Sequence, residues 1–383
     1  MNHGGLTLQA LQNRVGNDEV ALLRIVTIYR PAGGAGSRIF PPTFPTSRDD
    51  PSPYLLEERV RDGQPRKAVV LDQVPSEANR AEEALARAWA AGLVRMPMLR
   101  LTHQGAANTT ITGLQAPHRA FDAYWRDSLL HGVKFDKTEL GKTLQSANLD
   151  DSRALLKHDL GSLVYGSWNS HRKGRQARFP RIYASEIVGW DPVEGSRKAG
   201  RMDPLNLVGT RSGEGDEWIY SPAGAKTVKG KLSEIGHGNI APNATHGGVT
   251  ITTATRFATL SLTALARIGF GSARPEQQLA SRVLLAALAL LGDRLAFGGP
   301  GLWLRSGCEL VVDEETLEWV GRGGMVESFS LSREDAVDLY NASLEAALAT
   351  GAELELEPVE LTPSPALSKA IDFSLTKAES AGE

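Results

Sequence analysis

The feature that most constrains this chain is a helix without a polar face. The segment 275–295 begins with a proline, and the nine residues Val283 to Leu291 are apolar on every side of the helical turn. Such a helix must be buried among other elements, because no side of it can face water. The run is too short to span a bilayer. With 383 residues, 41% of them hydrophobic, the chain can bury this helix in a substantial core.

The composition excludes several classes of protein. Cys308 is the single cysteine, which excludes an intramolecular disulfide and a multi-cysteine zinc site and fits a reducing cytoplasm. The N-terminus lacks the basic and apolar regions of a signal peptide. We therefore predict a cytoplasmic protein with no membrane segment. The net charge is −3, so local basic patches must hold any polyanionic partner.

Strand and helix patterns alternate and are interrupted by long insertions, which predicts an α+β fold around one sheet. We expect strands in 19–30, 67–74, 163–165, 182–188, 248–265 and 310–312, and helices in 75–92, 117–130, 275–295 and 332–350. Ser76 is the expected N-cap of the first helix, and Ser332 that of the last. Residues 1–17 are predicted to be a short leader, residues 132–160 mostly helical, and residues 358–383 a loose C-terminal tail.

The segment Gly161–Trp190 carries a local positive field. No acidic residue occurs between Asp159 and Glu186, whereas the segment contains the cations Arg172, Lys173, Arg175, Arg178 and Arg181. Trp168, Phe179 and Tyr183 are interleaved with them. This pattern suits single-stranded nucleic acid, because cations meet phosphates while aromatic rings stack on unpaired bases. The alternative is a solvated basic loop.

Residues 192–248 are rich in glycine, lysine and turn residues and poor in large apolar side chains. We predict that they form a projecting β-hairpin or loop. Lys226, Lys229 and Lys231 lie near its centre. His237 and His246 lack the partner spacing of a metal site, so we expect exposed histidines and no metal.

Eight sequence blocks carry a family resemblance. In chain order they are VVLDQVPSEANRAEEAL, APHRAFDAYWRDS, LVYGSWNSHRKG, RFPRIYASEIVGW, GRMDP, HGGVT, TLSLTALARIGFG and LWLRSGCELV. Together they resemble the CRISPR-associated Cas-seven family of the RAMP superfamily, in the form found in type I-G (formerly I-U) systems. The resemblance extends from roughly residue 40 to residue 312.

The resemblance implies a non-catalytic backbone subunit of a Cascade-type surveillance complex that needs no cofactor. It implies an RRM-like (ferredoxin-like) palm, a helical finger insertion for which residues 93–160 are the candidate, and a thumb hairpin for which residues 192–248 are the candidate. The implied partners are the crRNA guide, target DNA, further copies of the chain arranged head to tail, and other Cascade subunits. The thumb of one copy would fold over the RNA against its neighbour.

Charge, position and block similarity together select the residues that we expect to contact RNA. Asn79 and Arg80, for example, lie near the start of a helix, where backbone amide groups favour an anion. The full set is Ser76, Asn79, Arg80, His118, Arg119, Arg126, Trp168, Ser170, His171, Arg172, Lys173, Arg175, Arg178, Arg181, Arg201, Lys226, Lys229, Lys231 and Arg256.

Two other functions compete. A metal-dependent ribonuclease would need carboxylates that converge on a cation, and its candidate ligands are Asp72, Asp122, Asp127 and Asp203. For Asp122 and Asp127, salt bridges to Arg119 and Arg126 are the expected role. A small-molecule enzyme could use the Gly33–Gly36 loop for a phosphate, although that loop lacks the required strand-to-helix context.

Overall fold

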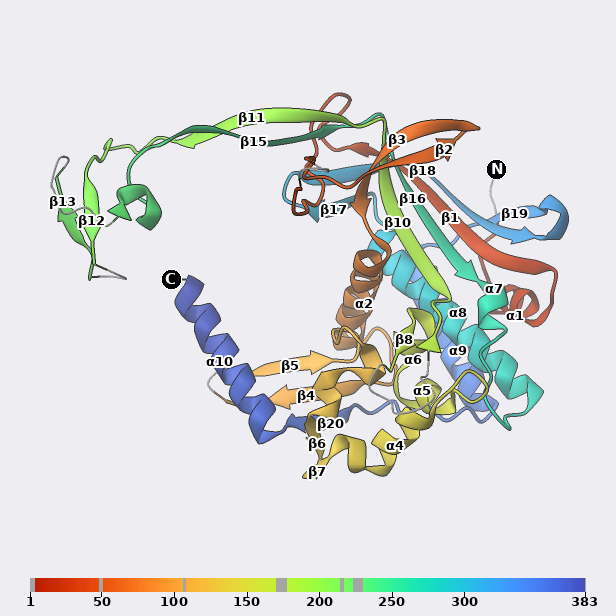
Figure 1. Cartoon of the computed structure of the whole chain (residues 1–383). Helices are drawn as coiled ribbons and strands as arrows, with labels where there is room; N and C mark the ends of the chain where they lie inside the picture. Colours follow the sequence, from red (N-terminus) through yellow and green to blue (C-terminus); the bar gives the residue numbers. More distant parts are fainter. Residues whose placement is uncertain are drawn as a thin grey trace.

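The chain folds into an α+β protein with one large curled sheet, a smaller second sheet and a long projecting arm (Figure 1). The structure is a computed structural model. It describes residues 4–47, 51–105, 108–169, 178–213, 217–222 and 230–382, without the side chains of residues 242–246 and 377–382. No helix in these ranges is both long and apolar enough to cross a membrane.

The large sheet has eight strands in the order β17-β18-β1-β16-β10-β3-β2, with β19 paired to β18, and every pair is antiparallel. Its strands are β1 (Val20–Pro31), β2 (Leu56–Arg61), β3 (Gln64–Asp72), β10 (Tyr183–Trp190), β16 (Ala254–Ser261), β17 (Gly301–Arg305), β18 (Cys308–Gly321) and β19 (Val326–Phe329). Most of the predicted strands therefore lie in one sheet. One exception is 163–165, which lies in and beside the helix α6 (Leu160–Val164). The others are the two ends of 248–265, because residues 248–250 belong to a strand of the arm and residues 262–265 to a short helix.

Helices cover one face of this sheet (Figure 1). They are α1 (Leu8–Gly16), α2 (Val74–Ala90), α8 (Pro275–Phe297) and α9 (Arg333–Ala349), with the short α7 (Leu262–Leu265) at one end. The residues from Val283 to Leu291 in α8 are all at most 1% exposed, which confirms the buried helix. Ser332 caps α9 in a capping box, as predicted. The prediction of a leader is wrong, because Thr7 caps α1 and Leu11 is fully buried.

The second sheet has five strands in the order β5-β4-β20-β6-β7. They are β4 (Leu99–His103), β5 (Thr109–Thr112), β6 (Ser128–Leu130), β7 (Val133–Lys134) and β20 (Val359–Pro363). The C-terminal strand β20 pairs parallel to β4 and antiparallel to β6. The prediction of a loose tail from residue 358 is therefore wrong: backbone hydrogen bonds hold β20 on both sides, Leu361 is fully buried, and the helix α10 (Pro365–Gly382) follows.

The region 93–160 is not a purely helical insertion, because it contributes four of these strands. Its helical elements are η1 (Arg119–Phe121), α3 (Ala123–Arg126), η2 (Phe135–Lys137), α4 (Glu139–Ser146) and α5 (Arg153–His158). The single helix predicted at 117–130 is broken because Arg119 has a left-handed φ of 50° and Asp122 caps a new turn at Tyr124. Such a backbone conformation cannot continue a right-handed helix.

The arm is an antiparallel ribbon of β11 (Val193–Arg201) and β15 (Ile240–Thr250), which continue from β10 and into β16. It extends far from the body (Figure 1) and carries at its tip β12 (Thr210–Ser212), β13 (Ile219–Ser221), β14 (Gly230–Lys231) and η4 (Leu232–Ile235). Leu232 is buried, but Met202 is 89% exposed and Leu205 78%. The tip thus leaves much of its apolar surface uncovered.

Candidate nucleic-acid interface

The start of α2 directly follows β3, which pairs with β10, the strand from which the arm leaves. The helix begins at Val74, two residues before the predicted cap Ser76, because Pro75 occupies the first turn, where its missing N–H is not needed. The cap residue Gln73 makes no side-chain hydrogen bond to the helix. Free N–H groups at such a terminus favour an anion. Ser76 is half-buried and Asn79 exposed beside this terminus.

Two arginines flank the junction of β3 and α2. Arg80 donates through Nε to Asp72 Oδ2 at 2.6 Å and through Nη2 to the carbonyl of Leu304 at 3.0 Å. Arg305 donates through Nη2 to the carbonyl of Leu71 at 3.5 Å, and its buried Nε has no partner. A buried donor without a partner carries a free-energy cost that a bound anion would remove.

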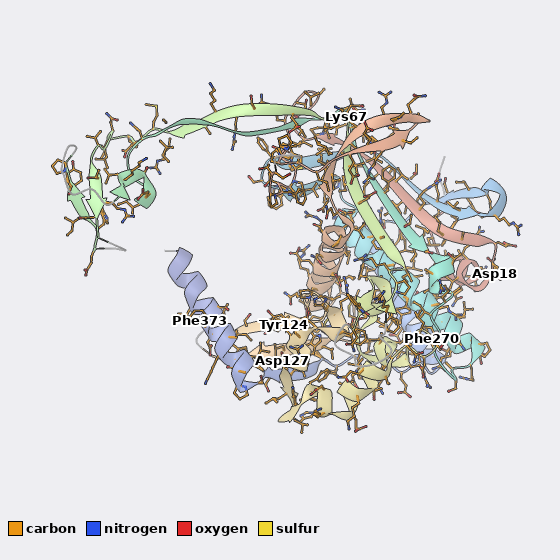
Figure 2. All side chains as sticks on the ribbon, in the orientation of Figure 1. Asp18, Lys67, Tyr124, Asp127, Phe270 and Phe373 are labelled. Atoms are coloured by element: carbon orange, nitrogen blue, oxygen red, sulfur yellow. The ribbon has the colours of Figure 1, made fainter. Side chains whose placement is uncertain are left out.

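Two further arginines connect the arm to the same region. The backbone N–H of Phe40 donates to the carbonyl of Gly307, in the turn that follows Arg305, and Arg197 of β11 lies 5.3 Å above the Phe40 ring. Arg38 donates to the carbonyl of Ser196 at 3.3 Å. We call Arg38, Arg80, Arg197 and Arg305 the arm-root arginines. Figure 2 shows that the exposed Lys67 also lies at this root.

The basic segment Gly161–Trp190 is only partly exposed on the surface. Trp168 of β8 (Ser167–Trp168) is 49% exposed, and Arg178 of β9 (Arg178–Phe179) lies 5.0 Å above its ring. Arg181 is also exposed. The expected stacking role of Phe179 and Tyr183 is wrong, because both rings are buried in the core. Ser170, His171, Arg172, Lys173 and Arg175 lie outside the described residues.

Two of the predicted RNA ligands are buried structural groups. Arg256 is fully buried and pairs with Glu77 and Asp293 at 2.8 and 2.7 Å, because its position on β16 faces the helical layer. Arg119 makes two hydrogen bonds to the buried Glu82 and a third to the carbonyl of Gly166. Burial and these contacts hold both guanidinium groups inside the fold, although Arg256 Nη1 is buried without a partner, so their assignment to RNA contact is wrong.

The remaining predicted ligands are scattered. Arg126 pairs with Asp127 at 2.6 Å, and Arg201 donates to the carbonyls of His237 and Gly238 at 2.9 Å, which fixes the tip to the ribbon. His118 and Lys231 are exposed, on the body and the arm tip respectively. Lys226 and Lys229 lie outside the described residues.

The carboxylates of the competing nuclease hypothesis each have a local role. Asp72 pairs with Arg80, Asp127 with Arg126, Asp122 caps α3, and the N–H of Leu205 lowers the pKa of Asp203. Within the described ranges, no three His, Cys, Asp or Glu side chains gather as metal ligands would. The Gly33–Gly36 loop closes on itself through a 2.7 Å hydrogen bond from Ser37 Oγ to the carbonyl of Gly34.

Sequence reasoning did not select Arg38, Arg197 and Arg305. Arg38 and Arg305 have few cations near them in the sequence, whereas Arg197 is followed by Lys198 and Arg201, a local cluster that could have marked it. Only tertiary contacts place them: Arg305 reaches the β3–α2 junction at Leu71, and Arg38 and Arg197 join the loop after β1 to the base of β11. For Arg305 the available signal was the block LWLRSGCELV, which contains it.

Comparison with known proteins relates part of this chain to one family. The family model described as "CRISPR-associated protein GSU0053" matches residues 23–193. This match confirms the resemblance to the CRISPR-associated Cas-seven family, and the matched range contains the first four sequence blocks. No curated protein matches the chain significantly. A chain of the solved "CRISPR RNA-guided surveillance complex, pre-nicking" is 12% identical, covering 92% of this chain and 99% of that one, at a TM-score of only 0.33.

Proposed function

We propose that this chain is a non-catalytic backbone subunit of a type I CRISPR surveillance complex, of the type I-G form. In this proposal several copies bind one crRNA guide head to tail and hold its spacer for pairing with target DNA, together with other Cascade subunits. The large sheet and its helices act as the RRM-like palm, and the arm acts as the thumb. The family match supports the CRISPR-associated part of this assignment.

The observation that carries the RNA-binding part is the convergence of the arm-root arginines. Four separate segments of a slightly acidic chain contribute these arginines. Arg80 and Arg305 flank the uncapped start of α2, and Arg38 and Arg197 lie at the base of the arm. Backbone N–H groups, guanidinium groups and a buried donor without a partner are all suited to a phosphate. Exposed Trp168 and Arg178 on the body offer a stacking face for a base.

The shape of the arm supports assembly in several copies. Its ribbon leads away from the body, so its tip cannot cover the large sheet of its own chain (Figure 1). The exposed apolar side chains of the tip, such as Met202 and Leu205, are suited to contact with another molecule. A contact between an arm and a different surface is heterologous and propagates along a guide.

The test is the salt dependence of RNA binding. We expect the double variant Arg197→Gln/Arg305→Gln to bind single-stranded RNA more weakly, regardless of RNA sequence. The slope of log affinity against log salt concentration should flatten by about 0.7 for each lost phosphate contact. The matched control is Arg95→Gln/Arg322→Gln, which removes two arginines distant from the arm root. Equal slopes for the two double variants would contradict this interface.

A further inference from the structure

A buried ionic cluster lies directly beneath the arm-root arginines. Asp72, Glu77, Arg256 and Asp293 are each at most 2% exposed. Arg294 pairs with both Asp293 and Glu315 and extends the cluster toward β18. Counting ion-paired groups, four carboxylates (Asp72, Glu77, Asp293 and Glu315) face three guanidinium groups (Arg80, Arg256 and Arg294). Among the ion-paired groups, carboxylates therefore outnumber guanidinium groups by one.

Of these four carboxylates, Glu77 is the one with a buried oxygen that lacks a hydrogen-bond partner. Its Oε2 accepts hydrogen bonds from Arg256 Nε at 2.8 Å and from Ser185 Oγ at 2.9 Å. Its Oε1 is buried and has no partner. The carboxylate of Asp72 lies within hydrogen-bonding reach of Glu77. When two carboxylates lie within hydrogen-bonding reach, their repulsion favours a state in which one of them is protonated.

The other groups around the pair do not take up this proton near neutral pH. Those that face Glu77, Asp72 or their direct partners are Arg256 (β16), Arg80 (α2), Arg305 (β17), Cys308 (β18), Tyr29 (β1), Tyr183 (β10) and Asp293 (α8). Burial raises the pKa of Tyr29 to about 12 and that of Cys308 to about 11, so both stay neutral. Burial opposes ionisation of Asp293, but Arg256 and Arg294 lower its pKa to about 2.

Unlike Tyr29, Cys308 and Asp293, Glu77 has a pKa near neutral pH. Burial raises its pKa to about 7, and the neighbouring Asp72 raises it further against the opposing effect of Arg256. Near neutral pH the free protein is thus divided between a form with Glu77 ionised and a form with Glu77 protonated.

We propose that an RNA phosphate at the arm root draws Arg80 away from Asp72, and that the protein takes up one proton, which Glu77 and Asp72 then share. This rests on the proposed function. Arg80 is half-buried and its guanidinium is the surface layer of the cluster. When it moves to a phosphate, four carboxylates remain with two guanidinium groups. A proton from solvent binds Glu77 Oε1, which then donates to the carboxylate of Asp72.

The sign of the effect follows from linkage. Well below pH 7 Glu77 is protonated before RNA arrives, so binding takes up no proton and the affinity is independent of this group. Above pH 7 the free protein must gain the proton on binding, so the affinity falls as the pH rises. The limit for one proton is about tenfold in affinity per pH unit.

The experiment measures binding of an oligoadenylate to the full chain by titration calorimetry, at constant ionic strength between about pH 6 and pH 8.5. Adenine does not titrate in this range. Repeating each titration in two buffers with different heats of ionisation counts the protons directly. We expect uptake approaching one proton per bound copy above pH 7.

Glu77→Gln should abolish this uptake, because the amide cannot gain the proton. The matched control is Glu82→Gln on the same helix: burial also raises the pKa of Glu82 to about 7, but its partner is Arg119 rather than an arm-root arginine. Uptake should persist in this control. If Glu77→Gln does not fold, Arg80→Gln replaces it. In this variant RNA binding draws no guanidinium away from the carboxylates, so uptake should again vanish.

Binding by the wild type without proton uptake, or uptake that survives in both Glu77→Gln and Arg80→Gln, would overturn the linkage and leave the RNA-binding assignment standing. Loss of proton uptake in Glu82→Gln alone would assign the uptake to Glu82, beside Arg119, and not to Glu77. No RNA binding at any pH would refute the proposed function and the linkage together.

Discussion

Replacing Arg256 tests whether this arginine stabilises the fold or contacts RNA. The sequence analysis placed Arg256 in contact with RNA, whereas the structure buries it completely between Glu77 and Asp293, with its guanidinium carbon 3.6 Å from the Phe297 ring centroid. Arg256→Met keeps much of the side-chain volume and removes the charge. Two buried carboxylates then lose their common cation.

Removing one partner of a buried ion pair typically costs about 3–5 kcal/mol, because the remaining charge stays desolvated. We expect the free energy of unfolding to fall by about this amount in urea denaturation followed by tryptophan fluorescence. The loss should grow as the pH rises above about 7: in the wild type Glu77 ionises there and Arg256 stabilises its carboxylate, whereas the variant lacks this cation.

The matched control is Arg24→Met. Arg24 on the neighbouring strand β1 pairs with Glu318 at a similar distance of 2.7 Å, but its side chain is 42% exposed. A solvated pair of this kind contributes about 1 kcal/mol or less. If Arg256→Met weakens RNA binding while its free energy of unfolding falls by no more than about 1 kcal/mol, Arg256 contacts RNA and does not have the structural role that we assign to it.

Two other predictions concern the arm and the chemistry. Replacing residues 204–237 by a short Gly/Ser linker keeps the ribbon and removes its tip. The variant should fold and bind RNA weakly, but it should no longer assemble a defined number of copies on one guide. If native mass spectrometry finds the wild-type copy number, the tip does not set the register of the copies. The purified protein should cut neither RNA nor DNA in the presence of magnesium or manganese, because Asp72 and Asp203 are engaged in local contacts. Cleavage that disappears in Asp72→Ala or Asp203→Ala would contradict the non-catalytic assignment.

Local patterns in the sequence determined much of the secondary structure. The apolar run from Val283 to Leu291 specified a buried helix, and Ser332 marked the start of α9. Alternation located β1 and most of the other strands of the large sheet. The glycine-rich, weakly apolar composition of residues 192–248 predicted a projection, and the structure forms a ribbon there. These features depend on neighbours within a few residues, which is the range that periodicity and capping report.

The tertiary structure decided which charges meet solvent. Arg256 and Arg80 look equally basic in the sequence, yet one is fully buried and the other reaches the surface. The sequence marks the two faces of a strand but not which face the helices cover. Likewise, β20 entered the second sheet beside β4, a partner far away in the chain. Burial and strand pairing depend on contacts between distant segments, and the electrostatics of the arm root follow from those contacts.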